Sequence, residues 1–264
     1  MNILIVGNCS NDFVGLLQQS SLLHKLYITA NSIEIDVPKI EYSTEEELAQ
    51  KCKQLQIDIA INTEQKFIVE GLIDYLKSRY INIISPNKKW FNLEKSRLIA
   101  KQLLTHYSIN IPKKILAPKE FPLILRTDSL LVSKIVNSMN ELIGLMDKYK
   151  DEEFFLEEYL DGELFSLLTI WDGLSARYFI NLDILTEVQK DRLDILQAKF
   201  NFLLSDEKAD FIGFFVIKLI WAKNDWHVLD FKMCFDEKLV SERVKKDLLY
   251  ILELAIYQKI DILR

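Results

Sequence analysis

The sequence predicts two architectures in succession, a parallel α/β unit followed by antiparallel α+β structure. Over the first 90 residues, short apolar and β-branched runs alternate with helix-like segments, which is typical of a parallel sheet with helical crossovers. Beyond residue 117 the apolar runs follow one another more closely, and the turn dipeptide Asp172-Gly173 separates two of them, which favours antiparallel hairpins. The 264 residues, 49% of them hydrophobic, are sufficient for a packed core.

The first unit is expected to contain four strands. The run NILIVG is continuous and apolar, and it ends at Gly7 before a polar loop and a helix that starts near Phe13. Only one glycine is present there, so the G-x-G-x-x-G signature of dinucleotide sites is absent. Ser43 with Glu46 predicts a capping box at the next helix. The expected strands are 2–7, 26–29, 57–61 and 81–84, with a helix at 67–80.

The second part begins with a helix that Asn92 is predicted to cap and that ends near residue 107. Ser138 with Glu141 predicts a second capping box. Strands are expected at 122–126, 131–136, 164–171, 174–180, 211–221 and 226–233, and helices at 138–150, 186–200 and 240–260. Six apolar residues are predicted to be substantially buried: Ile83, Leu125, Leu156, Phe215, Leu219 and Leu229.

The stretch FFLEEYLDGELFS, residues 154–166, is a candidate functional element. Two strand-like runs are joined by 160–162, with Glu157, Glu158 and Glu163 around the joint. A nucleotide-binding hinge has this form, because its backbone can hydrogen-bond an adenine edge while a nearby carboxylate holds ribose hydroxyls. A charged surface hairpin fits the same pattern, and the stretch by itself favours the hairpin.

A carboxylate in the last expected strand is a second candidate. Strict alternation along WHVLDFKM puts Asp230 and Lys232 on one face together with Trp226 and Val228, and a turn at 224–225 would place Asp230 opposite Leu219. A carboxylate among apolar neighbours needs a partner. Magnesium is one candidate, because it prefers oxygen ligands, and Lys232 is the other. The spacing favours an Asp230–Lys232 ion pair.

Two arginines complete the candidate set. Arg97 lies on the connecting helix, and Arg126 ends the strand PLILR. Either guanidinium could hold a phosphate, although solvated ends of a helix and a strand are the simpler interpretation of each.

Composition limits the classes of partner. The net charge is −6 without a basic stripe, so nucleic acid is not expected as a partner. No apolar run reaches the ~18 residues of a membrane span, and the first residues do not fit a signal peptide. The three cysteines lie far apart, which favours a reduced, cytoplasmic protein.

The order of these stretches resembles the glycinamide ribonucleotide synthetases (phosphoribosylamine–glycine ligases), which are ATP-grasp carboxylate–amine ligases. The hinge and the segment 93–112 are the most specific parts of the resemblance. The matching stretches are MNILIVGN, NTEQKFIVEGLIDYL with Glu64, ISPNKKWFNLEKSRLIAKQLLTHYSINIP, FPLILRTDSLLVSKIV, FLEEYLDGELFSLLTIWDG, FIGFFVIKLIWA, WHVLDFKMCFDE and KKDLLYILELA.

This resemblance implies a domain order and a function. We expect an N-terminal pre-ATP-grasp α/β domain (1–90), a helical connection (91–117), a small ATP-grasp lobe (118–172) and a large lobe (173–264), with the family's C-terminal domain absent. It further implies ATP and Mg²⁺ as cofactors, and phosphoribosylamine and a small amino acid as partners. The implied nucleotide and metal residues are Arg97 and Arg126 at the phosphates, Glu157, Glu158, Tyr159 and Leu160 at the adenine, Glu163 near the ribose, and Asp230 at the metal.

The chain departs from the family at several of these positions. The family has lysine at Arg97 and Arg126, a carboxylate at Leu164 and an asparagine at Lys232, and its phosphate flap is rich in glycine whereas 127–134 has none. We therefore consider two hypotheses: a divergent ligase with lost or reduced activity, and a non-catalytic pseudoenzyme that serves as a nucleotide-binding or protein-interaction module. A third hypothesis keeps the chemistry but uses a different acid and amine.

Overall fold

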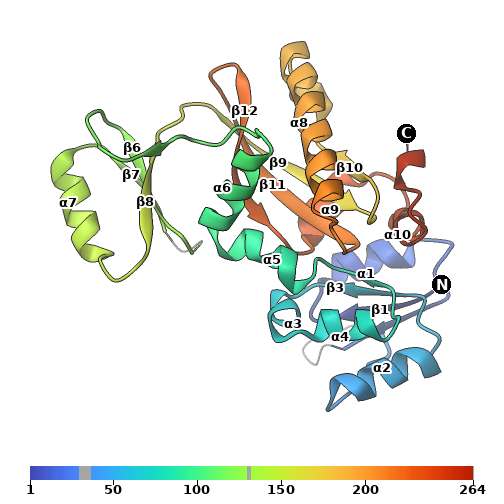
Figure 1. Ribbon diagram of the computed structural model, residues 1–264. Coiled ribbons are helices and arrows are strands. Elements are labelled where there is room, and N and C mark those ends of the chain that lie inside the picture. The colour runs from blue at the N-terminus through green and yellow to red at the C-terminus, as the bar shows by residue number, and fades with distance from the viewer. Residues whose placement is uncertain (30–36, 130–131, 264) are drawn as a thin grey trace.

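The structure is a computed structural model that describes residues 1–29, 37–129 and 132–263. Figure 1 shows three parts: an N-terminal α/β unit, a small sheet with one helix that projects to one side, and a larger sheet between them. The predicted combination of a parallel sheet and antiparallel sheets is confirmed.

The N-terminal unit has a four-stranded parallel sheet in the order β2-β1-β3-β4. Its strands are β1 (Asn2–Val6), β2 (Lys25–Ile28), β3 (Ile59–Asn62) and β4 (Ile83–Ile84). Its helices are α1 (Asn11–Gln18), α2 (Glu45–Gln54), α3 (Gln65–Glu70) and α4 (Leu72–Ser78). The central strands β1 and β3 are buried on both faces, which explains their unbroken apolar sequences.

Two helix predictions in this unit were wrong in detail. The cap of α2 is Thr44, whose hydroxyl accepts from Glu47 N at 3.1 Å, rather than Ser43. The expected helix 67–80 is divided into α3 and α4, because Gly71 takes a left-handed conformation with φ 92°.

The connection also contains two helices instead of one from Asn92, namely α5 (Lys88–Lys95) and α6 (Arg97–His106). Asn87 caps α5 through Trp90 N at 3.1 Å, and Ser96 caps α6 through Ile99 N at 3.2 Å. Ser96 has extended backbone angles, which interrupt the helix. The interruption places Arg97 in the first turn of α6.

The small lobe is a four-stranded antiparallel sheet in the order β5-β8-β6-β7, with its own core. Ser138 caps its helix as predicted, accepting from Glu141 N at 3.3 Å. Of the expected strand 131–136, residue 131 lies outside the described residues. The elements are β5 (Lys114–Ile115), β6 (Leu123–Thr127), β7 (Ser133–Val136), α7 (Met139–Lys148) and β8 (Phe154–Glu158).

The large lobe is a second antiparallel sheet in the order β10-β9-β11-β12, followed by helices. The expected final helix 240–260 is divided, because α9 ends at Arg243, Val244 is extended, and Asp247 caps a new helix, α10. The elements are β9 (Glu163–Trp171), β10 (Ala176–Phe179), η1 (Leu182–Ile184), α8 (Glu187–Asp206), β11 (Gly213–Ala222), β12 (Asp225–Lys232), α9 (Glu237–Arg243), α10 (Leu248–Ile256) and η2 (Ile260–Ile262).

The hinge stretch joins the two lobes. β8 pairs with β5 and β6, whereas β9 pairs with β10 and β11, so the surface-hairpin interpretation of residues 154–166 was wrong. By strand pairing, the last strand of the sheet β5-β8-β6-β7 ends at Glu158. A true hairpin follows, in which residues 172–175 connect β9 to β10.

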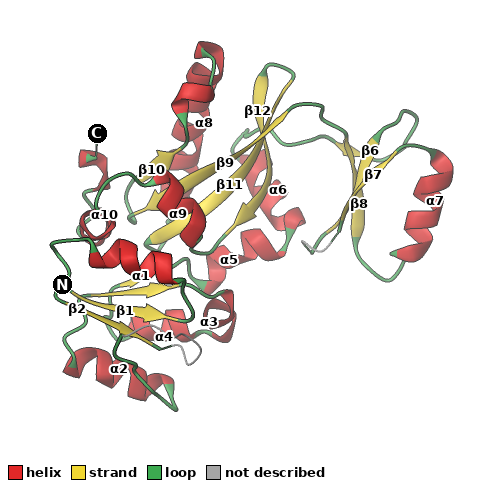
Figure 2. Cartoon of the chain, turned by 180° about the vertical axis from the view of Figure 1, so that it is seen from behind, coloured by secondary structure: helices red, strands yellow, loops and turns green. Residues whose placement is uncertain are grey.

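The N-terminal unit packs directly against the large lobe. Ser85 N donates to Ile212 O at 2.7 Å, and a Cβ on Gly213 would lie 2.9 Å from Ser85 N. The view from behind in Figure 2 shows the small lobe standing apart from these two. Five of the six predicted core residues are buried, whereas Leu229 is only partly buried.

A β-bulge in β12 overturns the expected facing of Asp230. The turn is Lys223-Asn224, both with positive φ, which pairs Ala222 with Asp225. Leu219 pairs with Val228 but Lys218 pairs with Asp230, so Leu229 is the extra residue. The side chains that pack in the main core are therefore Trp226, Val228, Phe231 and Met233, and Asp230 lies on the opposite face from the last two.

Candidate functional site

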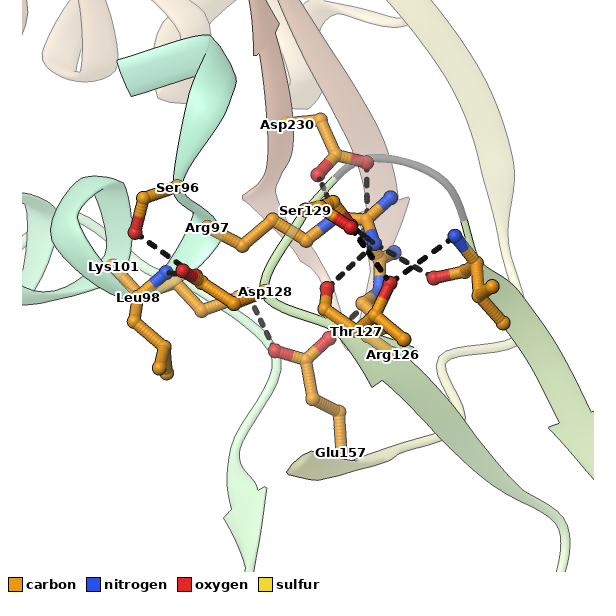
Figure 3. A network of polar contacts seen from close by, with 11 residues as sticks. Ser96, Arg97, Leu98, Lys101, Arg126, Thr127, Asp128, Ser129, Glu157 and Asp230 are labelled. Atoms are coloured by element: carbon orange, nitrogen blue, oxygen red, sulfur yellow. Dashed lines mark hydrogen bonds and ion pairs between the residues drawn. The ribbon is translucent and has the colours of Figure 1, made fainter. Parts of the chain in front are cut away.

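An ion-pair network connects α6 and β12 with the small-lobe strands β6 and β8 (Figure 3). Both oxygens of Asp230 on β12 are paired, Oδ1 with Arg97 Nε at 2.8 Å and Oδ2 with Arg126 Nη1 at 2.8 Å. Glu157 on β8 pairs with Arg126 Nε at 3.0 Å and with Lys101 Nζ at 2.5 Å. Three cations and two carboxylates thus meet in a buried cluster, which we call the inter-lobe cluster.

This cluster corrects two predictions. Arg97 and Arg126 are each only 6% exposed, so they are not solvated ends of a helix and a strand. Asp230 does not pair with Lys232, because the bulge changes its neighbours and Lys232 pairs instead with Asp236 at 2.7 Å.

Arg97 also holds the loop that the resemblance equates with the phosphate flap. Its Nη1 donates to the carbonyl oxygens of Thr127 at 3.0 Å, Ser129 at 3.2 Å and Val132 at 2.7 Å. The Asp128 side chain accepts from Ser96 Oγ at 2.9 Å and Leu98 N at 2.8 Å. The start of α6 is therefore tied to the small lobe.

Sequence reasoning missed Lys101 in the cluster and Asp128 beside it. Lys101 lies four residues after Arg97 and so on the same side of α6, which was an available signal. Burial lowers the pKa of Lys101, and the nearby Glu157 carboxylate opposes that shift. Asp128 gave no signal beyond its place in a polar loop.

The hinge residues 157–160 form ion pairs through their two glutamates and also line a pocket. The carboxylate of Glu158 accepts from Lys113 N at 3.1 Å and pairs with Lys223. Burial raises the pKa of Glu158, but Lys223 and the Lys113 backbone N–H together outweigh that effect and lower the pKa overall. Leu160 is buried against Ile220, and the Tyr159 side chain is 37% exposed.

A pocket of about 250 Å³ lies between the lobes at this hinge. Arg126, Glu157 and Glu158 are among its lining residues. Glu163 is exposed and does not line it, because alternation along β9 turns Glu163 to the face of Phe165. The apolar wall of the pocket consists of Pro112, Ile124, Ile135, Leu160, Ile220 and Leu229, and Leu164 also lines the pocket.

The residues around Asp230 do not fit a magnesium ion. Both carboxylate oxygens already accept from guanidiniums, and a cation would lie between like charges. Lys232 and Asp236 are occupied with each other. Among the described residues, no group of three or more His, Cys, Asp or Glu side chains is arranged to hold a metal.

The Lys232–Asp236 pair should give a pH-dependent contribution to stability. Burial raises the pKa of Asp236, but the bonds from Lys232 and from Leu239 N outweigh it, so the pKa is lowered. A lowered pKa gives stability that is present above the unfolded pKa and is lost as pH falls through the folded value. We expect Asp236→Ala to cost about 1 kcal/mol at pH 7, as for other helix caps. Urea unfolding should show this difference shrinking below about pH 4; an unchanged difference at pH 3 would contradict it.

A second, larger pocket of about 830 Å³ lies in the N-terminal unit, at the carboxyl ends of β1 and β3. Glu64 lies in it, accepts from Asn8 N at 2.7 Å and pairs with Lys66 at 2.7 Å. Burial raises the pKa of Glu64, but these partners outweigh it and lower the pKa. Open α/β sheets bind ligands at this edge.

Solved structures of known proteins share this architecture. The chain matches 98% of its length to the crystal structure of phosphoribosylamine–glycine ligase from Thermotoga maritima, with a TM-score of 0.75 and 15% identity, over 76% of that chain. N5-carboxyaminoimidazole ribonucleotide synthetase from the same organism matches 97% of this chain and 75% of its own, with a TM-score of 0.67 and 13% identity. This chain has the ATP-grasp fold.

Sequence relatives agree with the expected resemblance. Phosphoribosylamine–glycine ligase of Fusobacterium nucleatum is 20% identical, in a match that covers 97% of this chain and 73% of the relative. That of Caldanaerobacter subterraneus is 26% identical over 66% of this chain and 48% of its own length. No protein-family model matches the sequence. No helix in the described part of the chain is long and apolar enough to span a membrane.

Proposed function

We propose that this chain is an ATP-grasp protein of ligase descent that binds an adenine nucleotide between its lobes and has lost or reduced ligase activity. The observation that carries the proposal is the pair of guanidiniums held by Asp230, one of which, that of Arg126, lines the apolar pocket. The base would lie in the pocket along residues 157–160. The phosphates would take the place of the carboxylates at Arg97 and Arg126.

The charges of the inter-lobe cluster support this arrangement. Three cations face two carboxylates, so one positive charge is in excess. Guanidiniums bind phosphate in the same bidentate manner as carboxylate. A nucleotide would therefore exchange one set of anionic partners for another, and no metal would be required.

The same geometry argues against efficient ligation. An acyl-phosphate mechanism depends on preorganised charge around the transferring phosphoryl group, and the loss of one such contact commonly costs about 3–4 kcal/mol of barrier. Here the expected metal ligand Asp230 is bound to arginines, and the described flap carbonyls are held by Arg97. A chain with this geometry would serve as a non-catalytic module that binds a nucleotide or another protein. The three free cysteines support a reducing compartment such as the cytoplasm.

A second candidate function is retained ligase activity on phosphoribosylamine and glycine, or on another small acid and amine. The observation in its favour is the pocket around Glu64, which has room for a sugar-phosphate or an amino acid. Assays with phosphoribosylamine, glycine and ATP test it through ADP release.

Calorimetric titration with ATP and ADP, each with and without Mg²⁺, tests the proposal. We expect binding whose affinity changes less than about threefold with the metal, because the arginines carry the phosphate charge. Binding that requires Mg²⁺ would favour the ligase alternative. No binding at millimolar nucleotide would overturn nucleotide binding altogether and leave only the fold.

A further inference from the structure

Among the described residues that line the inter-lobe pocket, no carboxylate is free to accept hydrogen bonds from sugar hydroxyls. Two carboxylates line it, and both are already used. Glu157 is held by Lys101 and Arg126. Glu158 is held by Lys113 N and Lys223. No other carboxylate is among its described lining residues, and Glu163 faces away.

Leu164 on β9 is one of the apolar residues that line this pocket. It lines the pocket, yet its side chain is 72% exposed, so it forms part of the rim. A ligand with its base against the apolar wall and its anion at Arg126 would pass its sugar along this rim. An isobutyl group there can contact a sugar but cannot accept a hydrogen bond.

We propose that the pocket does not recognise ribose hydroxyls, so that it binds 2′-deoxyadenosine phosphates as well as the ribonucleotides. This inference rests on the proposed nucleotide binding and specifies its ligand class. A site built to hydrogen-bond a hydroxyl discriminates strongly against the analogue that lacks it, whereas an apolar contact distinguishes the two only weakly. Leu164 is the residue that sets this lack of discrimination.

Parallel calorimetric titrations with ATP, dATP and 2′,3′-dideoxy-ATP test the inference. We expect the three dissociation constants to agree within about threefold. If ATP binds and dATP is more than tenfold weaker, the inference fails while nucleotide binding stands. If none of the three binds, both proposals fail together.

The variant Leu164→Glu adds a positive test. A carboxylate at this rim should accept the ribose hydroxyls and give ATP an advantage of about tenfold over dATP. Leu174→Glu is the matched control, because Leu174 is 65% exposed and lies in the loop between β9 and β10, away from the pocket. We expect that control to leave the ATP-to-dATP ratio unchanged. An unchanged ratio in Leu164→Glu would show that the sugar does not pass Leu164, which would overturn the assignment.

Discussion

Replacement of Asp230 by alanine is expected to lower the free energy of unfolding by about 3–5 kcal/mol, because it leaves two buried guanidiniums without their shared carboxylate. The two arginines come from α6 and β6, so no single element can move to relieve the repulsion. Urea unfolding measures the loss. Asp194→Ala, an exposed position on α8, is the control and should change stability by less than about 0.5 kcal/mol.

The same variant separates an arginine partner from a metal ligand. If phosphates replace the carboxylate, Asp230→Ala should bind ADP about tenfold or more tightly without Mg²⁺, since a competing anion has been removed. ADP at 100 times its dissociation constant should then restore about 2.7 kcal/mol of stability. If Asp230 instead holds Mg²⁺, the variant should lose metal-dependent nucleotide binding. A stability loss below 1 kcal/mol would show that the guanidiniums do not depend on Asp230.

The architecture could be predicted from the sequence because its signals are local. The unbroken apolar strands β1 and β3 predicted a parallel sheet, and Ser138 and Asp172-Gly173 predicted a cap and a hairpin. The predicted helix boundaries were wrong where a single residue breaks a helix although the helical spacing of apolar residues continues. Gly71 and Ser96 interrupt helices whose apolar pattern continues across the break.

The candidate site was less predictable, because its partners are set by tertiary structure. The residues Arg97, Arg126, Glu157 and Asp230 were all selected from the sequence, and the structure brings them together. Their pairing was not selected, since one inserted residue at Leu229 reversed the facing of the end of β12. A bulge has no clear signature in a run of alternating residues. Their roles toward a nucleotide stay predictions.

Replacement of Glu157 is also expected to cause a large loss of stability. Variants at this position can distinguish the contribution of its charge from that of its packing. Its carboxylate is 1% exposed and pairs with Lys101 and Arg126, so Glu157→Leu should cost about 3–5 kcal/mol by leaving Lys101 buried and unpaired. The double variant Glu157→Leu with Lys101→Met removes both charges and leaves Arg126 paired to Asp230. Because buried ion pairs are often replaceable by apolar side chains of similar volume, we expect it to recover most of that loss. Urea unfolding of the wild type, the two single variants and the double variant gives the coupling energy directly. Equal instability of Glu157→Leu and the double variant would indicate that the glutamate acts through its shape rather than through its charge.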